Sequence, residues 1–125
     1  SAMSYAISLG LLILTALHTP PALSALRPGM MASLYGPAVT ESGLGILLHH
    51  RAIGFALVAL SCLAAAFVPV VRQPVLVLTG WSMLGFLVAY WVGGSPAGAI
   101  QRIALADLAC LPVLFFLAWA VWLRA

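Results

Sequence analysis

The stretch AIGFALVALSCLAAAFV, residues Ala52–Val68, decides the fold because it contains neither a charged side chain nor a proline. A helix needs about 20 predominantly apolar residues to cross the hydrocarbon core of a bilayer. Counting back to Leu44 extends this run beyond that length, and Pro69 ends it. The sequence therefore predicts a transmembrane helix over about 44–68.

Three further segments have the same apolar character, and they cover about 5–21, 75–92 and 100–123. The first contains Pro20 and Pro21, which we expect to end or sharply bend its helix. The tight turn Arg72–Pro74 and the glycine-rich Gly93–Gly98 separate the later spans. Short connections make consecutive helices antiparallel. The predicted fold is all-α, a single domain of four transmembrane helices in an antiparallel bundle.

Composition supports a bilayer environment. The chain of 125 residues is 65% hydrophobic and 6% charged, against roughly 25% charged residues in ordinary soluble domains. The net charge of +3 comes from arginines spread over loops and helix ends, so no clustered basic face is available for a nucleic acid. Cys62 and Cys110 lie in apolar runs, where a free cysteine behaves as a small hydrophobe.

Polar residues gather on one side of the predicted bundle, where the first and third spans end and the second and fourth begin. Arg51 lies seven residues after Leu44, and Asp107 lies seven after Ile100. Each is therefore about 10 Å below its helix start at 1.5 Å per residue. A lone charge at that depth is costly, so such charges are paired and are candidates for function. We predict that Arg51 and Asp107 form a salt bridge or are linked through one histidine or water.

These positions define the candidate site. Catalytic roles are predicted for His49, His50, Arg51 and Asp107, and ligand contacts for His18, Tyr35, Glu41, Tyr90 and Arg102. A purely structural alternative stays open: Arg51 reaches the headgroups, Asp107 is protonated, and the histidines are interfacial. Any cavity should open on the side of Arg27, Glu41 and Gly93–Gly98, be lined by His49 or His50 with Arg51, Tyr90 and Asp107, and narrow toward Cys62 and Trp81.

The proline-interrupted first span, the Leu34–Gly36 stretch and the start of the second span, Arg51–Gly54, followed by two plain spans, resemble small bacterial membrane proteins of the DoxX-like kind. The resemblance covers nearly the whole chain. It implies a four-helix membrane fold, and we expect the protein to lie in the cell inner membrane as a multi-pass protein.

Three functional hypotheses follow from the polar cluster. The first is the binding of a small hydrophobic or lipid-like molecule, with acid–base conversion of isomerase, cyclase or hydrolase type if the molecule reacts. The second is haem or metal binding by His18 with His49 or His50, although no cofactor signature is present and adjacent histidines point about 100° apart on a helix. The third is a non-catalytic subunit that assembles with itself or with another membrane protein, or passes a solute.

Overall fold

The computed structural model describes residues 1–24, 26–27, 33 and 42–124. Four long helices make up this part of the chain: α1 (Ala2–Leu23), α3 (Ser42–Phe67), α4 (Arg72–Val92) and α5 (Ala99–Trp119). The 3-10 turn η2 (Pro69–Val71) precedes α4, and the π-helical turn η3 (Ala120–Arg124) continues α5. The described residues contain no strand, and the predicted all-α four-helix fold is confirmed.

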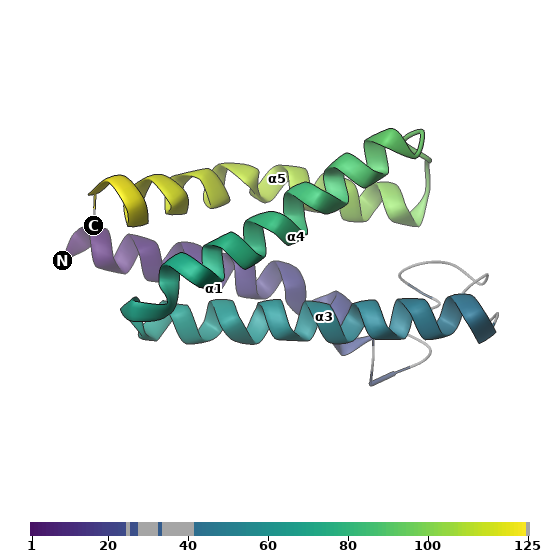
Figure 1. Ribbon diagram of the computed structural model, residues 1–125, viewed down its shortest axis with the longest axis horizontal. Coiled ribbons are helices and arrows are strands. Elements are labelled where there is room, and N and C mark those ends of the chain that lie inside the picture. Colours follow the sequence, from purple (N-terminus) through teal and green to yellow (C-terminus); the bar gives the residue numbers. More distant parts are fainter. Residues whose placement is uncertain (25, 28–32, 34–41, 125) are drawn as a thin grey trace.

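The helices run antiparallel, and both chain termini lie at one end of the bundle (Figure 1). α1 packs against α3 and α5, and α4 packs against the same two helices. The first and last helices are therefore neighbours, which closes the bundle. We call the end with the termini the terminal end, and the end where α3 begins and Gly93–Gly98 joins α4 to α5 the loop end.

Each of the four helices is long and apolar enough to cross a membrane, with spans at Ala2–Leu23, Gly43–Phe67, Pro69–Val92 and Ala99–Arg124. Between 22% and 28% of each apolar window is buried inside the bundle, so apolar side chains also cover its outside. Trp81 and Val92, for example, are more than four-fifths exposed. An outer surface of this kind suits lipid and not water, as expected for a membrane protein.

Pro20 and Pro21 do not end α1 where the sequence predicted. The helix continues to Leu23, and a turn at Ser24 follows. Each proline keeps φ near the helical value, but it removes one backbone hydrogen bond and its ring crowds the carbonyl four residues earlier. In an apolar bilayer, leaving the helix earlier would expose more backbone groups without partners. The helix therefore tolerates the pair.

The reversal between α3 and α4 also lies earlier than predicted. Val68 is extended, with φ −121° and ψ 94°, and α4 begins at Arg72 after η2. The predicted turn Arg72–Pro74 is wrong, because these residues form the first turn of α4. Pro74 fits there since the first N–H groups of a helix have no intrahelical partner.

Arg72 holds this reversal together. Its side chain is 8% exposed, and its Nε donates to the Ala65 carbonyl at 2.9 Å. One Nη donates to the Ala66 carbonyl and to Ser8 Oγ, both at 3.2 Å, and Ser8 Oγ donates to Ala66 at 2.7 Å. The last carbonyls of a helix have no intrahelical donor and carry partial negative charge. Arg72 therefore caps α3 and ties it to α1.

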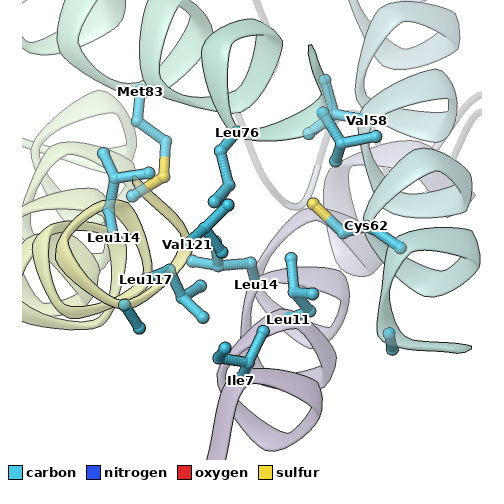
Figure 2. Close-up of a cluster of buried hydrophobic side chains, with 14 residues drawn as sticks. Ile7, Leu11, Leu14, Val58, Cys62, Leu76, Met83, Leu114, Leu117 and Val121 are labelled. Atoms are coloured by element: carbon cyan, nitrogen blue, oxygen red, sulfur yellow. The ribbon is translucent and has the colours of Figure 1, made fainter. Parts of the chain in front are cut away.

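Buried apolar side chains from all four helices meet in one core, which Figure 2 shows in close-up. Leu11 and Leu14 of α1, Cys62 of α3, Met83 of α4 and Leu117 of α5 are buried to within 1% exposure. α1 and α5 approach closely here, because a Cβ added at Gly10 would lie 2.8 Å from Leu117 Cδ2. The His18–Asp107 region lies beyond this close-packed half, toward the loop end.

Candidate functional site

The polar residues singled out in the sequence lie toward the loop end on all four helices. His18 is near the end of α1, His49–Arg51 are in the first turns of α3, and Tyr90 is near the end of α4. Arg102 and Asp107 lie in the first half of α5. Tyr35 and Glu41 lie outside the described residues. These residues lie at similar depths along their helices, but they project from different helix faces, so similar depth alone does not place their side chains in contact.

A cavity of about 300 Å³ lies between α1 and α5, with Phe55 of α3 as its third wall. We call it the His18–Asp107 cavity. Its polar lining residues among those described are His18, Arg102 and Asp107. The remaining lining is apolar: Ala16, Leu17, Pro20, Pro21, Phe55, Ala99, Ile103 and Ala106. A pocket with a mostly apolar wall and a few convergent polar groups is the usual form of a small-molecule site.

The His18 ring is 1% exposed and held in place by its own helix. Nδ1 lies 2.7 Å from the Leu14 carbonyl oxygen. A carbonyl only accepts, so Nδ1 carries the hydrogen. The Phe55 ring packs beside it, with centroids 5.7 Å apart and planes inclined by 37°. Nε2 is fully buried and has no hydrogen-bond partner among the described residues.

The lack of a hydrogen-bond partner at His18 Nε2 among the described residues is the strongest indication of a bound molecule. Buried polar atoms in folded proteins are almost always hydrogen-bonded, and an unmade bond costs roughly 1–3 kcal/mol. A ligand or water that donates a hydrogen bond to Nε2 would remove this cost. His18 lines the cavity, so a ligand bound there would lie beside its ring.

Asp107 lines the same cavity from α5 and is 5% exposed. It lies eight residues after Ala99, about 12 Å along the helix axis. The charge of Arg51 acts on its carboxylate electrostatically. The cavity is therefore lined by two buried polar side chains, His18 and Asp107.

Arg51 also packs against Phe55. Its guanidinium carbon is 4.8 Å from the centroid of the Phe55 ring and 4.6 Å from that of Phe86, so two aromatic faces flank the charge. Arg51 and His50 line a separate cavity between α3 and α4, which shares Phe55 with the first. The predicted direct or bridged link between Arg51 and Asp107 stays a prediction, supported by their electrostatic interaction.

The remaining predicted residues divide between the two sides. Arg102 lines the His18–Asp107 cavity with an exposed side chain. His49 and His50 are exposed and do not line it, and the cavity lined by Asp107 also lacks Arg51 and Tyr90. The lining predicted from the sequence therefore differs from the observed one, because residues on one helix separated by one or two positions point in different directions.

Tyr90 has a structural contact instead. Its hydroxyl donates to the Pro96 carbonyl at 2.7 Å, and its own carbonyl accepts from the Ser95 N–H at 3.1 Å. Gly94 has φ +96°, the left-handed conformation that commonly ends a helix. Tyr90 thus fastens the connection between α4 and α5.

Sequence reasoning missed Phe55 and the backbone beside the proline pair. Phe55 separates the two cavities and contacts both His18 and Arg51. A signal for it existed, since it lies four residues after Arg51 and so on the same helix face.

Metal binding gains no support from this part of the protein. Residues 1–24, 26–27, 33 and 42–124 contain no group of three or more His, Cys, Asp or Glu side chains placed to hold a metal ion. His18 faces a cavity that neither His49 nor His50 lines. The cysteines are free, with Cys62 buried and Cys110 half-buried, as the sequence predicted.

Comparison of the chain with protein-family models, with curated proteins and with solved structures gave no match.

Proposed function

We propose that this protein resides in the bacterial inner membrane and binds a small hydrophobic or lipid-like molecule in the His18–Asp107 cavity. The observation that carries the proposal is that His18 lines a cavity of about 300 Å³ while its buried Nε2 lacks a hydrogen-bond partner among the described residues. That volume is at the lower end of the range for ligand pockets. The molecule, or the part of it that is enclosed, is therefore small.

The cavity's chemistry supports an apolar molecule with one polar group. Eight of its eleven lining residues are apolar, and these would contact the body of the ligand. His18 and Asp107 would meet its polar group, while Arg102 lies at the exposed border. A histidine and a carboxylate on one ligand group are also the usual partners in proton transfer, so acid–base conversion of the bound molecule belongs to the proposal.

Filling the cavity tests the proposal directly. Ala106 lines the cavity, whereas Ala109, also exposed and one turn further along α5, does not. We expect Ala106→Phe to reduce the amount of small molecule that co-purifies with the protein by about tenfold or more, because the ring would occupy the ligand's space. Solvent extraction and mass spectrometry of the purified protein measure this amount.

Ala109→Phe is the matched control, since it adds the same ring to the same helix outside the cavity. It should retain the molecule at the wild-type level. Equal retention in Ala106→Phe and the wild type, or a wild-type protein that retains no molecule, would contradict the proposal.

A further inference from the structure

The wall of the His18–Asp107 cavity is rich in hydrogen-bond acceptors. Because Nδ1 of His18 donates to Leu14, a neutral ring presents a lone pair at Nε2. An ionised Asp107 carboxylate also only accepts. Both side chains are more than nine-tenths buried. His18 Nε2 has no hydrogen-bond partner among the described residues, and the Asp107 carboxylate interacts electrostatically with Arg51. A ligand must therefore supply the hydrogen.

The proline pair affects two backbone carbonyls of residues that line this cavity. The nitrogens of Pro20 and Pro21 carry no hydrogen, so the carbonyls of Ala16 and Leu17 lose their ordinary donors four residues later. All four of these residues line the cavity. Donors are scarcer, and the charged one in the lining is the exposed Arg102.

Charge decides what kind of donor fits. The carboxylate of Asp107 would attract a cation, but Arg51 already acts on it and Arg102 lines the same cavity. One negative charge beside two positive ones does not favour an ammonium group. An anionic ligand would pair with Arg102 at the exposed border, but deeper in the cavity its charge would meet the Asp107 carboxylate and the His18 lone pair. A neutral hydrogen-bond donor can pair with the acceptors of the cavity without bringing a positive or a negative charge into it.

We propose that the ligand of this cavity is a neutral molecule with a hydroxyl group on an apolar body, an alcohol or a phenol, and that His18 Nε2 accepts its hydrogen. This inference rests on the proposed function and specifies its ligand class. The apolar body lies against Phe55, Ile103 and the proline rings, and the hydroxyl points toward His18 and Asp107.

A pair of probes that differ only in the donor tests this inference. 4-Propylphenol and its methyl ether, 4-propylanisole, have nearly the same shape, but the ether cannot donate. With the full chain in lipid nanodiscs, and empty nanodiscs to subtract partitioning into lipid, we expect the phenol to bind about tenfold more tightly, the effect of one buried hydrogen bond. His18→Phe should remove this difference, because phenylalanine keeps the ring and loses the acceptor.

Nitrogen NMR of the histidines tests the same contact without changing His18. The chain has three histidines, and the exposed His49 and His50 can both be replaced by glutamine to leave His18 alone. We expect the Nε2 resonance of His18 to move when the phenol is added and to stay in place with the ether. This measurement holds even if His18→Phe fails to fold.

The outcomes separate this inference from the proposed function. Equal affinity for the two probes, tighter binding of the ether, or an unchanged His18 resonance with the phenol would overturn the hydroxyl class. If the ether binds and Ala106→Phe abolishes its binding, cavity binding itself still stands. Saturable binding of neither probe would overturn the hydroxyl inference, and retention in Ala106→Phe then decides the proposed function separately.

Discussion

At the scale of single residues, His18 and Asp107 have the same unusual property. Each is almost fully buried and each lines the same cavity, and His18 Nε2 has no hydrogen-bond partner among the described residues. A buried group without a partner destabilises the folded protein unless something else supplies the contact. His18 has such an atom and shares its cavity with a buried carboxylate, and this is why the proposed function centres on the two residues.

Asp107→Asn should weaken ligand retention because the amide replaces one acceptor oxygen with a donating NH₂ group of the same shape. We expect about a tenfold loss, equivalent to roughly 1.4 kcal/mol, which is typical of one hydrogen bond. The measurement is the amount of co-purified molecule by mass spectrometry. Arg124→Ala, which also removes a charge but at the terminal end, should leave retention unchanged, and a larger loss there than in Asp107→Asn would place the site at the wrong end.

At the scale of elements, the helix ends differ from one another more than the helix interiors do. The interiors of α1, α3, α4 and α5 are all apolar, but each junction between helices is stabilised by different contacts. Arg72 caps α3 with side-chain donors, and Tyr90 fastens the α4–α5 connection through Pro96. α1 accommodates two prolines and leaves carbonyls beside the cavity. The junctions at the loop end thereby shape the candidate site.

Arg72→Gln should destabilise the bundle without touching the cavity. The guanidinium makes three hydrogen bonds, to Ala65, Ala66 and Ser8, and a shorter neutral side chain cannot replace them. We expect the free energy of unfolding to fall by about 2–4 kcal/mol, since hydrogen bonds from charged groups contribute more than neutral ones. Equilibrium unfolding in mixed detergent and SDS micelles measures this change.

The matched control is Arg124→Gln. Arg124 is exposed and lies 5.9 Å from the Trp119 ring centroid, a contact that contributes about 1 kcal/mol or less at an exposed site. A similar loss of stability in both variants would show that Arg72 acts through charge alone and not as a cap.

At the scale of the whole molecule, the bundle divides into a closed half and a cavity-containing half. The core of Figure 2 fills the half nearer the termini, where Gly10 lets α1 lie against Leu117 of α5. Toward the loop end the same two helices enclose the His18–Asp107 cavity. Tight packing at one end thus holds α1 and α5 together while leaving space between them at the other.

Gly10→Val should separate these helices. The new side chain would overlap Leu117, which is fully buried and cannot move aside without displacing its neighbours. Overpacking of this kind costs about 1–3 kcal/mol, and we expect a lower midpoint of thermal unfolding in detergent. Gly85→Val on α4 is the control, because no atom lies within 4 Å of its added Cβ. Equal midpoints for the two variants would argue against close α1–α5 packing.

The sequence by itself determined the four spans, their antiparallel order and the side of the bundle on which His18, Arg51 and Asp107 lie. These features depend on helix length and on distance along the helix axis. The hydropathy of the sequence locates each span, and a residue's position within the span gives that distance. Only the tertiary structure decided which of the polar residues share a cavity. Helices that are apolar on every face carry little signal for rotation about their axes, so packing between neighbours sets that rotation. His18 consequently faces Asp107 across the α1–α5 contact, whereas His50 and Arg51 face α4.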